Sequence, residues 1–188
     1  MADVVLFHSI LGLRPAEAAI AARLRAAGHA VTTPDLYDGL RTDGYDEGFR
    51  MHDAIGDAEL LRRAREAVAA MPARTVLAGV SMGGGIAGEL WKERRETAGV
   101  LLLHGPAPLA SAPRPGTPVQ VHMAEPDPFD EDAFIADWIA EAQALPIAFE
   151  AFRYPGAGHY FTDATLADHD AAAAELALDR TLAFLAQL

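Results

Sequence analysis

The feature that most constrains the fold of this chain is a glycine-rich turn at residues 79–83. The apolar segment before it, residues 76–80, predicts a buried strand, and the segment after it, residues 86–95, predicts a helix. The turn itself reads Gly-Val-Ser-Met-Gly, and its two glycines lack the Cβ atoms that would collide in a tight strand-to-helix connection. The pattern therefore predicts that Ser81 is held in a strained conformation, with its hydroxyl exposed at the N-terminus of a helix.

Strand and helix patterns alternate along the whole chain. Strands are predicted at residues 4–8, 30–33, 76–80, 99–104, 119–123 and 147–154. Helices are predicted at residues 15–27, 57–70, 86–95, 129–144 and 168–187. The alternation predicts one α/β domain over residues 1–188, with a mostly parallel six-stranded sheet and helices on both faces. Residues 35–53, rich in glycine and aspartate, predict a long loop and a candidate lid.

Composition excludes several classes of partner and chemistry. The formal net charge of −12 argues against nucleic acid and anionic membrane surfaces as partners. The chain has no cysteine, which excludes disulfides, thiolate zinc sites and a cysteine nucleophile. The N-terminal segment lacks the basic region of a signal peptide, and the apolar stretches are shorter than the ~20 residues that span a bilayer. We expect a cytoplasmic protein that is a monomer or a weak homodimer.

Two loops supply the partners that would make Ser81 a nucleophile. A serine needs a base to take its proton, and the base needs a carboxylate to orient it. Asp127 follows the predicted strand at residues 119–123, and His159 follows the predicted strand at residues 147–154. Ser81, Asp127 and His159 thus form a candidate triad in the order serine, acid, histidine, each at the end of a strand. Glu125 and Asp130 are alternative carboxylates, and an acidic patch that caps the next helix is the alternative interpretation of all three acids.

The loop after the first strand predicts the second half of an oxyanion hole. The backbone N–H groups of Ile10 and Met82 are the candidate donors. His8 and Ser9 either contact the substrate or are satisfied polar groups at a strand end. The aromatic residues of the predicted loop either line an acyl pocket or anchor the loop. These aromatic residues are Tyr37, Tyr45 and Phe49.

Taken together, short motifs along the chain resemble the dienelactone hydrolase family of α/β-hydrolases. They are Ile10-Leu11-Gly12, Pro34-Asp35-Leu36-Tyr37, residues 79–84, His122-Met123 with Asp127 five residues after the histidine, residues 157–161 and residues 180–185. The resemblance implies a compact α/β-hydrolase without a large cap, acting on small esters or lactones, and it supports Asp127 as the acid. Tyr160, within one of these motifs, joins His8, Ser9 and Tyr37 as a candidate substrate-binding residue.

Three positions depart from the family pattern. The family enzyme that opens dienelactone has a cysteine where this chain has Ser81 and a glutamate where it has Ser9. Family members that bind carboxylate-bearing lactones use arginines, one of them a few residues after the catalytic histidine, where this chain has Thr162 and Asp163. We expect Asp163 to lie near the mouth of the site and to disfavour anionic substrates, so that dienelactone itself is not the substrate.

These features together predict a serine hydrolase that cleaves a small, neutral or hydrophobic ester, thioester or lactone through an acyl-enzyme on Ser81, without a cofactor or metal. A non-catalytic small-molecule binder on a hydrolase scaffold is one alternative, and an acyltransferase that uses the same triad is another. Two further sets of polar residues are interpreted as structural. His122 is expected to pack inside a strand, and residues 168–170, Asp-His-Asp, are expected to begin a helix rather than to bind metal.

Overall fold

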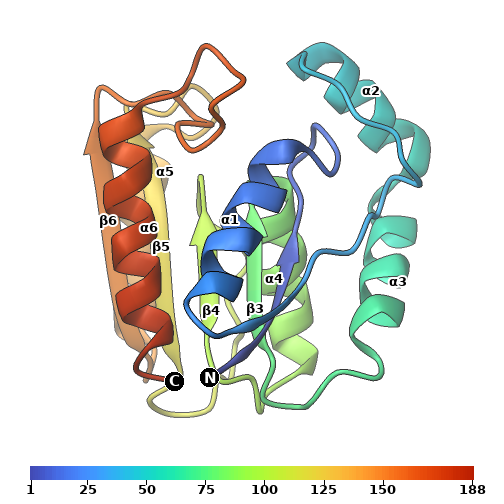
Figure 1. Ribbon diagram of the computed structural model, residues 1–188. Coiled ribbons are helices and arrows are strands. Elements are labelled where there is room, and N and C mark those ends of the chain that lie inside the picture. The colour runs from blue at the N-terminus through green and yellow to red at the C-terminus, as the bar shows by residue number, and fades with distance from the viewer.

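The computed structural model describes residues 1–188, which surround one six-stranded sheet whose strands are all parallel (Figure 1). The strands are β1 (Asp3–Phe7), β2 (Ala30–Thr32), β3 (Val76–Val80), β4 (Val100–Leu103), β5 (Pro118–Glu125) and β6 (Ala148–Pro155). They lie in the order β2-β1-β3-β4-β5-β6. The predicted six-stranded α/β architecture is confirmed, and every strand ends at the same edge of the sheet.

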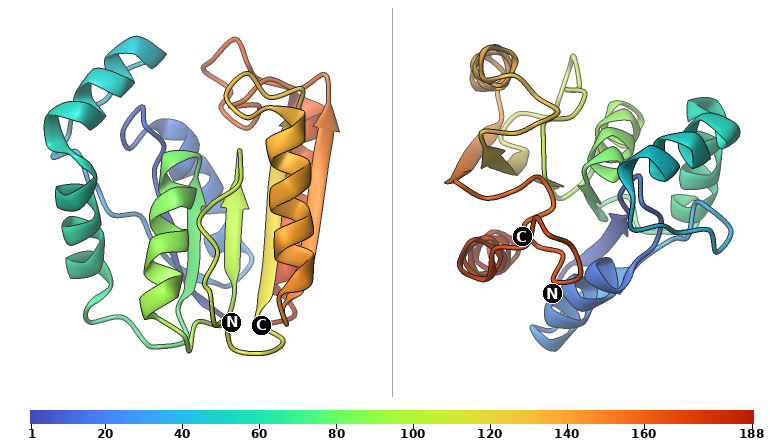
Figure 2. Two further views of the ribbon diagram at one scale, coloured as in Figure 1. Left: turned by 180° about the vertical axis from the view of Figure 1, so that it is seen from behind. Right: turned by 90° about the horizontal axis from the view of Figure 1, so that it is seen from above.

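Six helices surround this sheet. They are α1 (Pro15–Ala26), α2 (Tyr45–Ile55), α3 (Asp57–Val68), α4 (Met82–Glu93), α5 (Asp132–Ala144) and α6 (Ala171–Leu185). Helices α1 and α6 cover one face of the sheet, and α3, α4 and α5 cover the other, as the view from above in Figure 2 shows. Helix α2 covers neither face and lies beyond the carboxyl ends of the strands (Figure 1).

The strands are apolar on both sides because both faces of the sheet are covered. Successive side chains point to opposite faces, so Phe7 and Leu77 pack against α3, α4 and α5, whereas Leu6 and Ala78 pack against α1 and α6. The first of these cores has 21 buried residues and the second has 15. The helix that follows Ser81 is therefore anchored in the larger core.

Helix α2 corrects the expectation of a structureless loop over residues 35–53. Gly48 conceals it in the sequence, because glycine disfavours the interior of a helix. The lack of a side chain at Gly48 allows a close approach, since a Cβ on it would lie 3.0 Å from the carbonyl oxygen of Ile10. Met51 and Ile55 pack against the core on the α3–α5 face, so a few tertiary contacts stabilise the helix in place of intrinsic propensity.

Three other helices begin at different residues from those predicted. Helix α4 starts at Met82 rather than at residue 86, because the glycine run 83–85 belongs to its first turns. Helix α5 starts at Asp132 instead of residue 129, and α6 starts at Ala171 instead of residue 168. None of the helices is long and apolar enough to cross a membrane.

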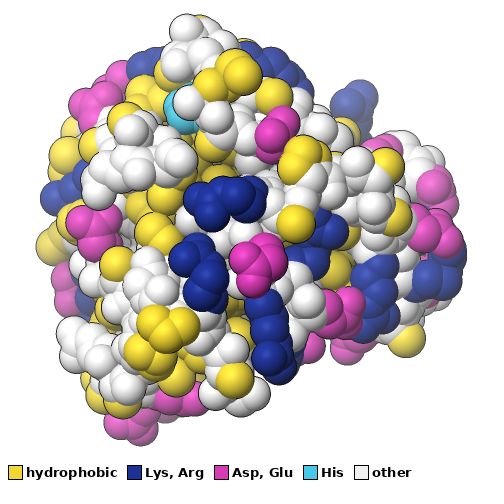
Figure 3. Space-filling view, turned by 90° about the horizontal axis from the view of Figure 1, so that it is seen from below, with side chains coloured by type: hydrophobic (Ala, Val, Ile, Leu, Met, Phe, Trp, Pro, Cys, Tyr) yellow, Lys and Arg dark blue, Asp and Glu magenta, His cyan; other side chains and the backbone are white.

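Basic and acidic side chains lie side by side at the end of the molecule where the strands begin (Figure 3). Loops at this end contain Arg74, Arg94, Arg95 and Arg114, which precede β3, β4 and β5. The opposite end, where the strands finish, is the end at which the candidate site residues meet.

Candidate active site

Ser81 occupies a strained turn between β3 and α4. Its backbone angles are φ 51° and ψ −111°, in a region that side-chain-bearing residues rarely adopt. A Cβ on Gly79 would lie 2.0 Å from the backbone of Gly83, and a Cβ on Gly83 would lie 2.3 Å from the carbonyl oxygen of Phe7. Both glycines are therefore required for the close packing of strand, turn and helix. Strain of this kind persists at sites where the surrounding structure enforces it.

Ser81, His159 and Asp127 form a continuous hydrogen-bonded chain. The Ser81 hydroxyl oxygen lies 2.9 Å from Nε2 of His159, and Nδ1 of the same ring lies 2.7 Å from Oδ2 of Asp127. The other carboxylate oxygen of Asp127 accepts a hydrogen bond from the backbone N–H of Phe129 at 2.9 Å. An Nδ1–H donated to the carboxylate leaves Nε2 free to accept the serine proton. The side chains of His159 and Asp127 are only 4% and 1% exposed, which protects this chain from water.

The two alternative carboxylates have other roles. Glu125 pairs with Arg153 at 3.3 Å, away from His159. Asp130 lines the cavity above Ser81, and burial, followed by the nearby charge of Asp127, raises the pKa of its carboxyl group. Asp127 is therefore the carboxylate that contacts the histidine ring.

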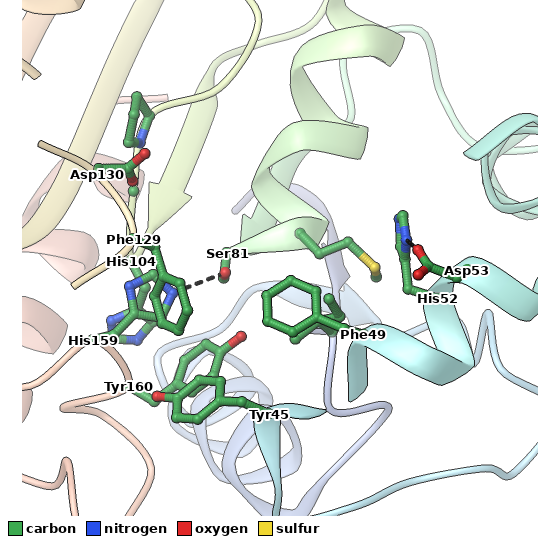
Figure 4. A pocket seen from close by; sticks show the side chains of 14 residues that line it. Tyr45, Phe49, His52, Asp53, Ser81, His104, Phe129, Asp130, His159 and Tyr160 are labelled. Carbon is green, nitrogen blue, oxygen red and sulfur yellow. Dashed lines mark hydrogen bonds and ion pairs between the residues drawn. The ribbon is translucent and has the colours of Figure 1, made fainter. Parts of the chain in front are cut away.

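Aromatic rings hold the His159 imidazole on several sides (Figure 4). Phe129 and Tyr160 pack against it edge to face, with ring centroids 4.8 and 4.6 Å away. His104 lies 6.1 Å from it, has the unusual backbone angle φ 66°, and bonds the hydroxyl of Thr162 through Nε2 at 2.7 Å. The Phe129 contact went unpredicted, although its place two residues after the acid is a usable signal.

The predicted oxyanion donors both lie beside Ser81. Met82 is the first residue of α4, and Ile10 lines the same cavity from the loop after β1. Burial raises the pKa of the Tyr160 phenol to about 12, and the hydroxyls of Ser81 and Ser9 and the N–H of Ile10 oppose that rise by hydrogen bonding. The phenol therefore keeps its proton at neutral pH and lies next to the donors.

The cavity above Ser81 has a volume of about 530 Å³. One wall is formed by His159 and its aromatic neighbours, and the other by Tyr45, Phe49, His52 and Asp53 of α2 (Figure 4). Tyr45 links the two walls, because its ring stacks on that of Tyr160 at 5.5 Å. Helix α2, which the sequence concealed, thus contributes four of the fourteen residues that line the cavity.

Of the four predicted substrate-binding residues, only Tyr160 lines this cavity. His8 is fully buried, donates from Nδ1 to the Ser9 carbonyl at 2.7 Å and accepts at Nε2 from the N–H of Leu36 at 3.0 Å. The backbone N–H of Ser9 donates to Glu17, and the hydroxyl of Tyr37 donates to the sulfur of Met82. His8, Ser9 and Tyr37 are buried and do not line the cavity, which favours the alternative interpretation of His8 and Ser9 as satisfied polar groups at a strand end.

Asp163 also differs from its expected role at the mouth of the site. It is buried, and its carboxylate accepts from Nε of Arg14 at 3.0 Å and from the backbone N–H and hydroxyl of Thr165 at 2.9 and 2.6 Å. Burial alone would raise the pKa of this carboxyl group, but the hydrogen bonds from Thr165 and the guanidinium of Arg14 hold the pKa below its ordinary value. Because this carboxylate faces an arginine and lies outside the cavity lining, it is not positioned to repel a substrate.

His122 and the acids of residues 168–170, which the sequence indicates to be structural, all form hydrogen bonds within the protein. His122 is fully buried between the hydroxyl of Tyr154 and the side chain of Gln120, and burial lowers its pKa to about 3. Asp170 caps α6 by accepting from two backbone N–H groups, whereas Asp168 accepts from the Tyr45 hydroxyl at 2.6 Å. No group of three or more histidine or carboxylate side chains is arranged to hold a metal ion.

Comparison with known proteins identifies the family and the fold of the chain. The model of the dienelactone hydrolase family matches residues 1–188. No curated protein matches the chain significantly. Among solved structures, the chain is similar to the dienelactone hydrolase-like promiscuous phosphotriesterase P91 from metagenomic libraries, with 20% identity, 100% of this chain and 87% of that one covered, and a TM-score of 0.81.

Two other solved structures give the same result. The protein m3DLH is 22% identical over 99% of this chain and 86% of its own, with a TM-score of 0.76. A phospholipase/carboxylesterase from Dyadobacter fermentans is 17% identical over 97% and 90%, with a TM-score of 0.65. At these identities the likeness establishes a shared α/β-hydrolase fold.

Proposed function

From the premise that the chain belongs to the dienelactone hydrolase family of ester-bond hydrolases, we propose that it is a serine hydrolase for a small neutral ester, thioester or lactone. The observation that carries the proposal is the hydrogen-bonded chain of Asp127, His159 and Ser81 at the floor of a cavity. These three residues are its proposed catalytic triad.

In the acylation step, the Ser81 oxygen attacks the carbonyl carbon of the substrate. Nε2 of His159 takes the hydroxyl proton, and Asp127 stabilises the resulting imidazolium through Nδ1–H. The carbonyl oxygen becomes an oxyanion, for which the N–H groups of Met82 and Ile10 are the proposed donors. The tetrahedral intermediate collapses as the bond to the leaving oxygen or sulfur breaks, and His159 returns its proton to the leaving group.

In the deacylation step, water attacks the acyl-enzyme and gives its proton to His159. The second tetrahedral intermediate collapses, Ser81 recovers its proton, and the carboxylic acid leaves. An acyltransferase would differ only in replacing this water with another acceptor.

The lining of the cavity supports a neutral substrate. Its charged side chains are Asp53 and Asp130, and no lysine or arginine lines it. A carboxylate-bearing substrate would meet like charge there without a compensating cation, which disfavours binding. The apolar surface that remains comes from the aromatic rings and the Ile10 and Met82 side chains, which suit an uncharged ester or lactone.

A covalent probe tests the proposal directly. A fluorophosphonate should label Ser81 with loss of fluoride, and the protein should hydrolyse p-nitrophenyl acetate. Ser81→Ala should abolish labelling and lower kcat by up to about a million-fold with the fold intact, since only the hydroxyl is removed. Ester turnover by the alanine variant at a rate near that of the natural protein would exclude Ser81 as the nucleophile, and a natural protein that binds esters without turnover would favour the binding role.

A further inference from the structure

A second cavity adjoins the one above Ser81. It has a volume of about 610 Å³ and lies between α3 and α4. His52 and Met82 line both cavities, so their side chains form the partition between them. Met82 directly follows the proposed nucleophile, and its unbranched thioether adapts readily to a neighbouring group. His52 is held by Asp57, with Nε2 2.9 Å from the carboxylate.

The walls of the second cavity are mainly apolar. Leu60 and Leu61 of α3 line it together with Ile86 of α4, and its acidic side chains are Asp57 and Glu89. A further residue of this lining, Gly85, has free space above it, since a Cβ on it would meet nothing within 4 Å. A narrow apolar chain therefore has surface to contact there, whereas an anionic group would meet the carboxylates of Asp57 and Glu89 with no lysine or arginine in the lining.

The mechanism determines which part of an ester can point toward this cavity. The leaving oxygen must lie near Nε2 of His159, because it receives its proton from there. The carbonyl oxygen must point to the N–H groups of Ile10 and Met82. The acyl chain attached to the carbonyl carbon takes the remaining direction, away from His159. Figure 4 shows His159 and His52 on opposite sides of Ser81, so this direction leads to the partition.

We propose that the second cavity binds the acyl chain of the substrate, and that the natural substrates are esters or thioesters of straight-chain, uncharged fatty acids long enough to pass His52 and Met82. This inference rests on the proposed serine hydrolase function. It specifies the acyl side of the substrate, which the cavity above Ser81 alone leaves open.

Two substitutions that fill the second cavity from opposite walls test the inference. Gly85→Leu introduces a side chain into the open space on α4, and Ala58→Phe introduces one from the exposed rim on α3. Ala22→Leu is the matched control, because it adds a leucine at an exposed position of α1 on the other face of the sheet. The readout is the ratio of kcat/KM for p-nitrophenyl octanoate to that for p-nitrophenyl acetate.

We expect each cavity-filling variant to lower the octanoate-to-acetate ratio at least about ten-fold, because the methylenes lose their apolar contacts. Ala22→Leu should leave the ratio unchanged. A natural protein that hydrolyses acetate esters and whose ratio is moved by neither variant would overturn the acyl-chain site while leaving the serine hydrolase standing. Fluorophosphonate labelling of Ser81 in each variant reports that the site is folded, and absent labelling of the natural protein would instead refute the proposed function.

Discussion

Two buried carboxylates at the carboxyl end of the sheet, Asp127 and Asp163, differ in what their partners let them do. Both lie in loops after strands of the same sheet half, and their residues are 8% and 5% exposed. Asp127 faces the imidazole of His159, whose charge can change during a reaction. Asp163 faces the guanidinium of Arg14, which stays charged at all accessible pH values. Both carboxylates are buried, so it is their partners that distinguish them. Asp127 can assist proton transfer at His159, whereas Asp163 forms a permanent ion pair with Arg14 that holds loops together.

Asp163 belongs to a group of contacts around Arg14, which we call the clasp. The Arg14 guanidinium bonds Asp163 and Thr165 of the loop after β6, as well as the carbonyl of Thr42 and the carboxylate of Asp43 before α2. These contacts connect the start of α1 with both walls of the cavity. The clasp is thus expected to affect the stability of the walls, whereas Asp127 is expected to affect the chemistry between them.

Between the two carboxylates, the largest expected effect is on catalysis, at Asp127. Asp127→Asn should lower kcat by up to about ten-thousand-fold, because the amide favours the wrong tautomer of His159. The change is isosteric and should leave the urea midpoint of unfolding close to that of the natural protein. Steady-state kinetics on p-nitrophenyl acetate measure the loss.

Asp163→Asn and Glu125→Gln are the controls for this prediction. Neither carboxylate touches His159, so both variants should retain kcat within a few-fold of the natural value. Equal losses of kcat in Asp127→Asn and Asp163→Asn would remove the distinction between the two carboxylates.

The next largest effect is on stability, at Arg14. Arg14→Met keeps much of the apolar stem but leaves the Asp163 carboxylate buried without its cation, which costs about 3–5 kcal/mol when one partner of a buried pair is removed. Urea denaturation followed by circular dichroism measures the change in the free energy of unfolding. Arg23→Met is the matched control, since Arg23 pairs with Glu175 at an exposed site, where loss of the pair should have little effect. A loss in Arg14→Met no larger than in this control would show that the clasp is unimportant.

The comparison also shows where sequence reasoning succeeds. The apolar strands and the elbow glycines are local signals, so the parallel sheet and the turn at Ser81 could be predicted from them. Asp127 and His159 could be found because each follows a strand, and parallel strands end at one edge. The role of Asp163 could not, because its partner Arg14 is 149 residues away in the sequence. A local pattern reports that a residue lies at the sheet edge, but not which way its side chain points.

The same limit applies to the aromatic residues, for which the sequence left two roles open. Tyr37 and Tyr45 belong to one predicted loop, yet Tyr37 is fully buried behind Met82 and Tyr45 lines the cavity. Helix α2 places Tyr45 there, and within α2 Gly48 packs closely against the carbonyl of Ile10. Tertiary contact of this kind overrides helix propensity, so it is visible only in the folded chain.

A smaller effect is expected in the pH dependence of stability. The pKa of Asp163 is held below that of an unfolded aspartate, about 4, so the unfolded state takes up the proton first as the pH falls. The stabilisation is therefore complete above that pH and is lost as the pH falls through the folded-state pKa. Glu17 acts in the opposite sense, because burial raises its pKa.

Urea midpoints measured from neutral pH to about pH 3 for the natural protein and Asp163→Asn isolate the contribution of Asp163. Glu17 titrates in both proteins, so its effect cancels in the difference. The difference in the free energy of unfolding should shrink as the pH falls. A difference that stays constant with pH would mean that Asp163 does not titrate as its contacts predict.

The smallest effect concerns substrate charge. The sequence predicted that Asp163 repels anionic substrates, and the structure places Asp130 where it can have this role instead. Asp130 lines the cavity beside His159, whereas Asp163 is neutralised by Arg14 outside it. At mildly alkaline pH, where the Asp130 carboxylate is ionised, it should repel a carboxylate-bearing ester more than its neutral methyl ester. Asp130→Asn should therefore raise kcat/KM for the acid relative to the methyl ester by a few-fold, up to about ten-fold, because like charges at a partly hydrated site interact weakly. Asp163→Asn should leave this ratio unchanged. A change in the ratio with Asp163→Asn but not with Asp130→Asn would contradict this prediction. It would mean that Asp163 still repels an anionic substrate despite its pairing with Arg14.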